Sequence, residues 1–310
     1  MDLSIIIPCY NCEKTILKTL DALLVNKDDN YSFEIITVDN NSNDNTKNLL
    51  LDYKSKSYPD LNYVFEPNSG SANARNAGLE KAKGKIIVLI DSDIIVNRNW
   101  MNELLAPFSD DKVAIVGGKI ELSWYNGNPP EWFHRFSWIL GELDHGFKPR
   151  ILDHNKHINA GNYAIRTSLF KLVGGYPPCD APNDQVVGDG ECGLTRSIRA
   201  LGHEVFWAPK ASCQHLNDSK MITPDYMMHR FIQHGKANAF KKTNQIKETA
   251  DILNHVTSCI VSIYNLTNAI MRDIFKDRLN NRRRYWEIRK VIADLKYFIF
   301  LNFIEIFKRQ

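Results

Sequence analysis

The sequence predicts an α/β fold in which helices cover both faces of a mostly parallel central sheet, followed by a helical C-terminal extension. Two observations carry this prediction. From residue 3 to residue 91, short apolar runs rich in β-branched residues alternate with segments of helical periodicity, and strands that alternate with helices build parallel sheets. Beyond Pro224 the apolar periodicity is almost entirely helical.

Four apolar runs in the first part are typical of buried strands. They cover residues 3–8, 33–39, 61–66 and 86–91. The segments between them predict helices, because apolar or small residues recur there at helical spacing. These helices cover residues 13–26, 46–53 and 71–83. Such sheets bind ligands at the carboxyl ends of their strands, so the polar residues after Ile7, Val38 and Ile90 mark the expected site.

The middle of the chain has a looser pattern, from Val113 to Pro149. The short elements expected after it are strands over 163–166 and 203–207, and helices around 168–173 and after Asp189. Apolar spacing then predicts two longer helices, one around Met227 and Phe231 and another over 252–270. We therefore expect a first domain over residues 1–215, with halves 1–112 and 113–215, and a helical extension over 216–310.

Charge is distributed unevenly along the 310 residues. The 39 basic and 36 acidic side chains give a net charge of +3, but residues 1–215 carry −5 and residues 216–310 carry +8. An acidic body with a basic tail indicates two different tasks. The composition, with 44% hydrophobic and 24% charged residues, is that of a globular protein and excludes a disordered, collagen-like or disulfide-stabilised chain.

The first residues and the cysteines favour a cytoplasmic protein with free thiols. The N-terminal apolar run stops at Pro8 without a basic region before it, so a signal peptide is not expected. No apolar stretch reaches the roughly 18 residues of a membrane span. Cys9 and Cys12 have the spacing of a thiol redox motif, although we favour two small residues near a strand end. The other cysteines form no second close pair, so zinc is not expected.

Two carboxylates, Asp91 and Asp93, flank Ser92 at the end of an apolar strand. Residues two positions apart on a strand share a face, so both carboxylates can turn toward one hard divalent cation, which would bridge a diphosphate. A solvated turn is the alternative for this pattern by itself. Its position directly after the strand over 86–90 strengthens the cation hypothesis.

Similar polar loops follow two neighbouring strands. Asp39 can accept a hydrogen bond from a nucleobase, and Tyr10 offers an aromatic face for one. Turn chemistry explains each loop singly, but not its recurrence at three strand ends. The chain contains neither a Gly-rich phosphate loop ending in Lys-Ser or Lys-Thr nor a Gly-x-Gly-x-x-Gly turn after a strand, which disfavours P-loop and dinucleotide-binding proteins.

Seven motifs occur in an order that resembles the family 2 inverting glycosyltransferases, which have the GT-A fold. They are SIIIPCYN (4–11), VDNNSND (38–44), NARNAG (73–78), LIDSD (89–93), NAGN (159–162), GGY (174–176) and DGECG (189–193). The resemblance ends near His215 and covers about two thirds of the chain. It implies a Rossmann-like GT-A sheet, with residues 1–112 as the nucleotide-binding half and 113–215 as the acceptor and catalytic half.

The resemblance also implies roles for individual residues. Contacts to the nucleotide donor are implied for Pro8, Tyr10, Asn11, Asp39, Gly70, Arg75, Asp91, Ser92 and Asn162. Within this set, Tyr10 and Asp39 would hold the base, while Asn162 would line the donor-sugar pocket together with Gly161.

A divalent cation, Mn²⁺ or Mg²⁺, is implied in the same way. Asp93 would bind it directly, and Asp91 would approach the ribose and the hydrated metal. His215 matches a histidine that supplies a further metal contact, and a structural histidine is the alternative for this position. The cation would offset the charge that develops on the leaving diphosphate.

Inversion requires a base that deprotonates the acceptor hydroxyl. Many relatives use the aspartate of a Glu-Asp pair, whereas this chain has Asp189-Gly190-Glu191. Counting back from Gly202, Glu191 occupies the position of the base, and Asp189 is the alternative. A carboxylate in the first turn of a helix also stabilises that helix, and the two roles are compatible.

The sequence thus predicts a metal-dependent inverting glycosyltransferase that moves a sugar from a nucleotide donor, UDP-linked by expectation, to a glycan or lipid-linked acceptor in the synthesis of cell-surface polysaccharide or glycoconjugate. The alternatives are a catalytically silent nucleotide- or carbohydrate-binding module and a thiol redox protein. The basic C-terminal helices suit either an anionic membrane surface on the cytoplasmic side or a solvated packing face. Nucleic acid is not an expected partner, because the body is acidic and carries no binding motif.

Overall fold

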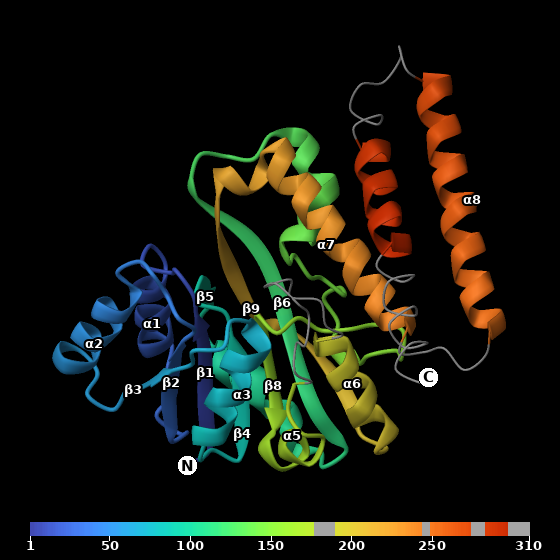
Figure 1. Cartoon of the computed structure of the whole chain (residues 1–310). Helices are drawn as coiled ribbons and strands as arrows, with labels where there is room; N and C mark the ends of the chain where they lie inside the picture. The colour runs from blue at the N-terminus through green and yellow to red at the C-terminus, as the bar shows by residue number, and fades with distance from the viewer. Residues whose placement is uncertain (177–189, 244–248, 274–282, 297–310) are drawn as a thin grey trace. The chain divides into compact units, whose positions relative to one another are not determined.

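The computed structural model of the protein describes residues 1–176, 190–243, 249–273 and 283–296 (Figure 1). These residues form two compact units. The first contains residues 1–125, 140–176 and 190–217, and the second contains 126–139 and the described residues from 218 onward. Among the described helices, none combines the length and the hydropathy that a membrane-spanning helix needs.

The first unit is built on one central sheet. Its strands are β1 (Leu3–Cys9), β2 (Phe33–Asp39), β3 (Asn62–Phe65), β4 (Ile86–Ile90), β5 (Ile94–Val96), β6 (Val113–Asn126), β7 (Arg150–Ile151), β8 (Asn162–Arg166) and β9 (Glu204–Asp218). The strand order is β3-β2-β1-β4-β8-β6-β9-β5, and β7 pairs with β9. The isoleucines of β1 are fully buried, as expected of a strand covered on both faces.

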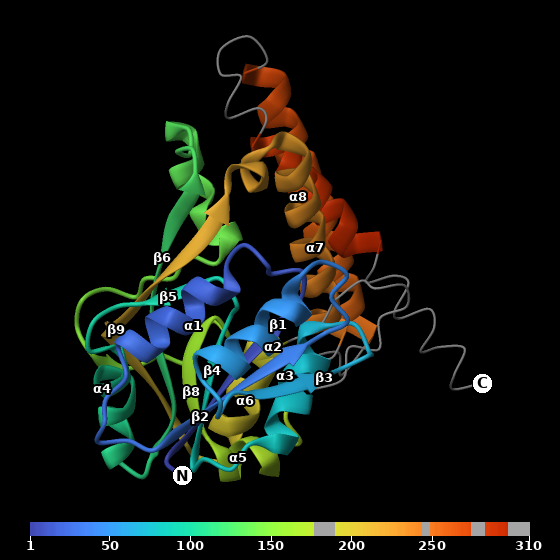
Figure 2. The ribbon, with the colours of Figure 1, turned by 90° about the vertical axis from the view of Figure 1, so that its left-hand side faces the viewer.

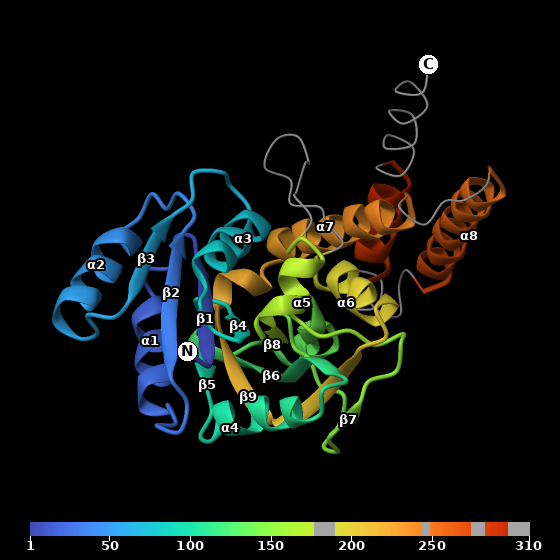
Figure 3. The same ribbon diagram turned by 90° about the horizontal axis from the view of Figure 1, so that it is seen from below.

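The helices of the first unit confirm the predicted alternation with strands. They are α1 (Ile16–Val25), α2 (Thr46–Lys56), α3 (Ser71–Lys81), α4 (Trp100–Leu105), α5 (Thr167–Leu172) and α6 (Gly190–Ala200). A short 3-10 turn over Ala106–Ser109 follows α4. Figure 3 shows α1 and α2 on one face of the parallel strands and α3 on the other.

The sheet is parallel in one part and antiparallel in the other. Strands β3, β2, β1 and β4 run parallel, as the alternation predicts. From β8 onward the pairs are antiparallel, including β4 with β8, β8 with β6, and β9 with β5. The parallel pattern therefore describes the part whose strands are joined by helical crossovers, because only those connections return the chain in the same direction.

Strands β6 and β9 are longer than the sequence predicts and run side by side (Figures 1 and 2). The sequence has a loose pattern where β6 lies, and it predicts only a short strand at the start of β9. The reason lies partly in Gly118 of β6, whose missing side chain lets the strands approach: a Cβ there would lie 1.9 Å from the carbonyl oxygen of Ala211. Glycine weakens the strand signal of a sequence while permitting such an approach.

The second unit is helical. It contains α7 (Pro224–Thr243), α8 (Thr249–Asp273), a further helix over residues 283–296, and 3-10 turns over Glu131–Leu140 and Ser219–Ile222. Figures 1 and 3 show the helix over 283–296 between α7 and α8. The rings of three residues pack against one another, either edge to face or tilted, with ring centroids 5.5–6.1 Å apart: Phe136, Phe231 and Trp286. The predicted helical extension is confirmed for its described residues.

Candidate active site

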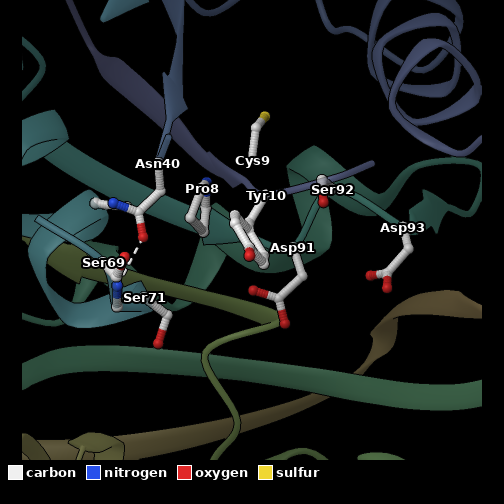
Figure 4. A pocket seen from close by; sticks show the side chains of 11 residues that line it. Pro8, Cys9, Tyr10, Asn40, Ser69, Ser71, Asp91, Ser92 and Asp93 are labelled. Carbon is white, nitrogen blue, oxygen red and sulfur yellow. Dashed lines mark hydrogen bonds between the residues drawn. The ribbon is translucent and has the colours of Figure 1, made fainter. Parts of the chain in front are cut away.

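A cavity of about 440 Å³ opens at the carboxyl ends of β1, β2 and β4, where the sequence predicts a site. Its lining residues are Pro8, Cys9, Tyr10, Asn40, Ser69, Gly70, Ser71, Ala74, Asp91, Ser92 and Asp93 (Figure 4). The charged side chains of this lining are Asp91 and Asp93, both acidic. A negatively charged ligand therefore meets a negative wall unless a cation accompanies it.

The loop from β3 into α3 is shaped by Asn40, a residue that sequence analysis does not single out. The Asn40 side-chain Oδ1 accepts a hydrogen bond from the Gly70 amide (2.8 Å), while its Nδ2 donates to the main-chain carbonyls of Glu66 (3.1 Å) and Asn68 (2.7 Å). Gly70 precedes α3 with φ +125°, a conformation that favours glycine. Asn40 therefore holds the first turn of α3 against the cavity.

Asp39 lies beside the cavity rather than on its wall. Its side chain is buried, with one oxygen accepting from the Ser42 amide (3.0 Å) and the other from the Tyr63 hydroxyl (2.8 Å). Burial and the Asp39 carboxylate raise the pKa of Tyr63 well above its usual value, so the hydroxyl remains a donor. The role of Asp39 in base recognition stays a prediction, and a base would share its carboxylate with Ser42 and Tyr63.

Tyr10 and Asn11 follow β1 and have different surroundings. Tyr10 is 60% exposed and lines the cavity, so its ring face is available to a planar ligand. Asn11 has φ +49° and instead connects the loop after β1 to the loop after β2. The Asn11 main-chain amide donates to the Ser42 hydroxyl (3.1 Å), and the Asn11 side-chain oxygen accepts from the Asn43 main-chain amide (2.9 Å).

Arg75 of α3 lies behind the cavity wall and pairs with Asp91. The guanidinium is 2.9 Å from the Asp91 Oδ1 and 3.9 Å from the Glu191 Oε1, and it lies over the Tyr176 ring at 5.5 Å. Burial acts to lower the pKa of Arg75, but Asp91, together with Tyr176 and Glu191, outweighs it and raises that pKa. One buried cation thus lies beside two of the predicted functional carboxylates.

Asp93 and His215 are brought together by the sheet, although 121 residues separate them in the chain. The antiparallel pairing of β5 with β9 places Ile94 opposite His215, and the His215 Nε2 lies 3.2 Å from the Asp93 Oδ2. Burial acts to lower the pKa of His215, but the Asp93 carboxylate outweighs it and raises that pKa.

The residues at Asp93 fit a divalent cation. The Asp93 Oδ1 is buried and has no hydrogen-bond partner among the described residues, which is unusual, because buried polar atoms are nearly always paired. The carboxylate offers an oxygen ligand and the imidazole a nitrogen ligand. This combination suits Mn²⁺ better than Mg²⁺, which prefers oxygen ligands alone. Asp91 is less available, since Arg75 occupies one of its oxygens.

Glu191, the predicted base, lies in the first turn of α6 and is about one third exposed. Through Arg75 it is connected to Asp91, and hence to the cavity wall. Asp189, the alternative base, lies outside the described residues. The identity of the base stays a prediction.

Asn162 has a structural environment and does not line the cavity. It is buried in β8, where its side-chain oxygen accepts from the Trp100 indole (2.8 Å) and its amide donates to the carbonyls of Lys119 (3.2 Å) and Ala211 (2.8 Å). Its neighbour Gly161 lies closer to the site: a Cβ there would be 3.0 Å from the Asp91 Oδ2. Within the NAGN motif, Gly161 therefore leaves room for the Asp91 carboxylate, and Asn162 binds neighbouring segments of the sheet. The contact of Asn162 with the donor stays a prediction.

The two cysteines of the redox alternative are free and buried. Burial raises the pKa of Cys9, whereas a hydrogen bond from Cys9 lowers the pKa of Cys12. In Figure 4 the Cys9 side chain points away from the Asp91 carboxylate. These contacts are those of small residues in a strand end, and they do not test thiol reactivity.

Comparison with known proteins gives a family match and several relatives. The model of the family described as Glycosyl transferase family 2 matches residues 4–173, more than half of the chain. Glycosyltransferase AglE of Haloferax volcanii is 34% identical over 125 residues, which is 40% of this chain and 41% of AglE. Hyaluronan synthase of Pasteurella multocida is 31% identical over 140 residues, 44% of this chain and 14% of that protein. The matches thus span less than half of these relatives.

Solved structures with similar folds also include glycosyltransferases. Mannosyltransferase PcManGT from Pyrobaculum calidifontis, in complex with GDP-Man and Mn²⁺, superposes with a TM-score of 0.62 at 18% identity, covering 96% of this chain and 86% of that one. Staphylococcus aureus TarS with UDP-GlcNAc superposes with a TM-score of 0.53 at 16% identity, covering 96% and 91%. At these identities the likeness concerns the fold.

Proposed function

The chain belongs to glycosyl transferase family 2 and has the GT-A fold, and from this premise we propose that it is a metal-dependent inverting glycosyltransferase. The observation that carries the proposal is the Asp93 carboxylate beside His215, at a cavity whose charged lining is acidic. In the part of the chain that the structure describes, one buried oxygen of this carboxylate has no hydrogen-bond partner. A nucleoside diphosphate needs a cation at such a wall.

The donor would lie across the carboxyl ends of the parallel strands. The exposed ring of Tyr10 can stack on a base, and Ser69 and Ser71 line the same cavity with hydroxyls. Mn²⁺ held by Asp93 and His215 would neutralise the charge that develops on the leaving diphosphate. We propose a UDP-sugar donor, in line with the UDP-GlcNAc bound to the TarS neighbour, although the mannosyltransferase neighbour binds GDP-Man.

Glu191 is the proposed base. An inverting transfer needs a base, here a carboxylate, that takes the proton of the acceptor hydroxyl. The oxygen of that hydroxyl then attacks the anomeric carbon, and the nucleoside diphosphate leaves. Arg75 lies between this carboxylate and Asp91. Its guanidinium therefore orients both the proposed base and the Asp91 carboxylate, which lines the donor cavity. A glycan or a lipid-linked glycan is the proposed acceptor, as the polysaccharide relatives suggest.

The test measures nucleotide release from a panel of UDP- and GDP-sugars with Mn²⁺ or Mg²⁺, together with nucleotide binding by calorimetry. Asp93→Asn is expected to lose the cation-dependent part of binding, because it removes the charge but keeps the shape. Glu191→Gln is expected to bind the donor normally and to lose at least about 100-fold in transfer. Glu80→Gln, an exposed carboxylate on α3, is the matched control and should change neither quantity.

Two outcomes would contradict the proposal. If no nucleotide sugar is bound or turned over, the donor cavity is misassigned. If a donor binds with Mn²⁺ but neither the wild type nor Glu191→Gln transfers a sugar to any acceptor or to water, the protein is a silent nucleotide-binding module. A Cys9→Ser variant that retains transfer would exclude the thiol redox alternative.

We further propose that the second unit binds an anionic membrane surface, where a lipid-linked acceptor would lie. Leu253, Ile260, Val261 and Tyr264 recur at helical spacing on α8, and each is at least half exposed. A second cavity of about 610 Å³ has Arg283 and other polar residues in its lining. An exposed apolar stripe beside basic residues is typical of helices that lie in a membrane interface.

Co-sedimentation with vesicles tests this surface. Phosphatidylglycerol vesicles are expected to bind the protein more tightly than phosphatidylcholine vesicles, and salt should weaken that preference. Ile260→Ser and Arg283→Gln should each reduce binding, while Arg98→Gln, an exposed arginine of the first unit, should not. Equal binding to both vesicle types, or none, would leave the basic helices as a solvated packing face.

A further inference from the structure

A group of three potential metal ligands lies in the second unit, within its helical bundle. His255 and Cys259 are one turn apart on α8, and Asp294 lies on the helix over 283–296. The His255 Nε2 is 2.9 Å from the Asp294 Oδ1 and 3.6 Å from the Cys259 Sγ. The three ligand atoms all lie within 4.8 Å of one another, so the side chains converge on one point from two helices.

These three side chains are removed from water. Cys259 is 4% exposed and Asp294 6%, and the side chain of His255 is 11% exposed. Burial of a carboxylate is costly unless charge and hydrogen bonds compensate for it. Helical bundles commonly place metal ions at such points, where inward-facing side chains of neighbouring helices meet.

Helix α7 holds the carboxylate from the other side. Asn238 of α7 donates a hydrogen bond to the Asp294 Oδ2, which leaves the Oδ1 directed toward His255. Gly235, one turn earlier, lets α7 come close: a Cβ there would lie 2.1 Å from the carbonyl oxygen of Lys290. A hydrogen bond that orients a ligating carboxylate is a usual part of metal sites.

A hydrogen-bond network without metal explains part of this arrangement. It explains the contacts of Asp294 with His255 and Asn238, but it leaves Cys259 with a weak contact at 3.6 Å. The same distance suits a metal site well. With Zn–S and Zn–N bonds of about 2.3 and 2.0 Å, a nitrogen and a sulfur ligand of tetrahedral zinc lie roughly 3.5 Å apart.

We propose that His255, Cys259 and Asp294 bind Zn²⁺ and thereby clamp α8 to the helix over 283–296. The ligand set identifies the metal class, because sulfur and imidazole favour zinc over the hard cations Mg²⁺ and Mn²⁺. Three protein ligands leave a fourth position of the tetrahedron for water. The inference concerns the second unit and does not depend on the proposed function.

The experiment titrates the full-length, metal-free protein with Co²⁺ and with Zn²⁺ alone, without nucleotide. Co²⁺ is expected to produce the near-ultraviolet absorption of a thiolate–cobalt bond at one equivalent, and Zn²⁺ to displace it and raise the unfolding temperature. Cys259→Ser should abolish the absorption and weaken Zn²⁺ binding at least about 100-fold. Cys192→Ser, the control for cysteine chemistry, and Asp93→Asn, the control for the donor cavity, should keep both.

If a variant fails to fold, the wild-type titration still tests the proposal, because the absence of thiolate–cobalt absorption there overturns it. The proposal is overturned if Cys259→Ser retains the absorption. Stabilisation by Zn²⁺ without that absorption overturns it as well, because the proposed cation site at Asp93 and His215 contains no thiolate. Loss of the zinc effect in Asp294→Asn, whose amide can still bond to Asn238, would assign the third ligand. Retention of full affinity in that variant would overturn the assignment of Asp294.

Discussion

A half-buried histidine makes the second unit sensitive to mild acid. His234 of α7 packs edge to face on Trp138, with ring centroids 5.1 Å apart. Burial, together with the positive charges of Arg230 and Lys290, lowers the pKa of His234 from 6.5 to about 4. Between these values the unfolded chain binds a proton that the folded chain does not, so stability falls as the pH decreases. Proton linkage gives a loss of about 2 kcal/mol between pH 7 and pH 5.

The assay is chemical denaturation followed by tryptophan fluorescence at several pH values between 7 and 5, for the wild type and for His234→Phe. Phenylalanine keeps the aromatic contact with Trp138 but cannot take up a proton. The wild type is expected to lose about 2 kcal/mol more than the variant over this interval, and other titrating groups cancel in the difference. Equal losses in the two proteins would refute the reasoning.

Three further results are expected in the first unit. Arg75→Met should lower the free energy of unfolding by about 2 kcal/mol, as loss of a hydrogen bond to a charged group does, and urea denaturation measures this change. The same variant should reduce sugar transfer, because Asp91 loses its partner, and nucleotide release measures that effect. Gly118→Ala should cost about 3 kcal/mol, because its Cβ would lie 1.9 Å from the Ala211 oxygen, and the same denaturation measures it. A chelator should weaken nucleotide binding in the wild type and change little in Asp93→Asn, as calorimetry can show.

The predictable part of the fold is the part with local signals. The strand over 33–39 is found at its predicted bounds, because β-branched residues fill its centre and polar loops bound it. Strand β6 has no comparable signal, since Gly117 and Gly118 interrupt the apolar pattern and its second half is partly exposed. What these glycines permit is an approach to β9 that depends on the tertiary structure.

The candidate site divides in a similar way. Asp91, Asp93 and Tyr10 follow strands that the alternation predicts to be parallel, and all three line the cavity. Asn40 is missed, although it adjoins Asp39 in the same motif, because nothing local indicates which of two neighbouring polar side chains turns toward the cavity. Which of the two side chains faces the cavity depends on Tyr63 of the neighbouring strand β3, whose hydroxyl donates a hydrogen bond to the Asp39 carboxylate.

The zinc site is hidden from sequence for another reason. Pairs of cysteines are the usual local sign of zinc, and Cys259 has no partner cysteine nearby in the sequence. Its proposed partners are a histidine four residues earlier and Asp294, 35 residues later on another helix. A single cysteine and histidine at that spacing are common on helices, so the pattern carries information only once the helices are packed.

The contacts of the two aspartates also indicate which of them binds the proposed cation directly. Arg75 occupies the Asp91 Oδ1 at 2.9 Å and compensates its charge from behind the cavity wall. Asp93 has no permanently charged guanidinium beside it; its neighbour is His215, whose imidazole is neutral when it binds a metal, and among the described residues its second oxygen is buried without a hydrogen-bond partner. An incoming divalent ion gains more from the carboxylate whose charge is less compensated, because a nearby positive charge repels the ion and weakens its attraction to the other carboxylate. Asp93 is therefore the direct ligand in our proposal, and Asp91 the residue that Arg75 holds in place at the wall of the donor cavity.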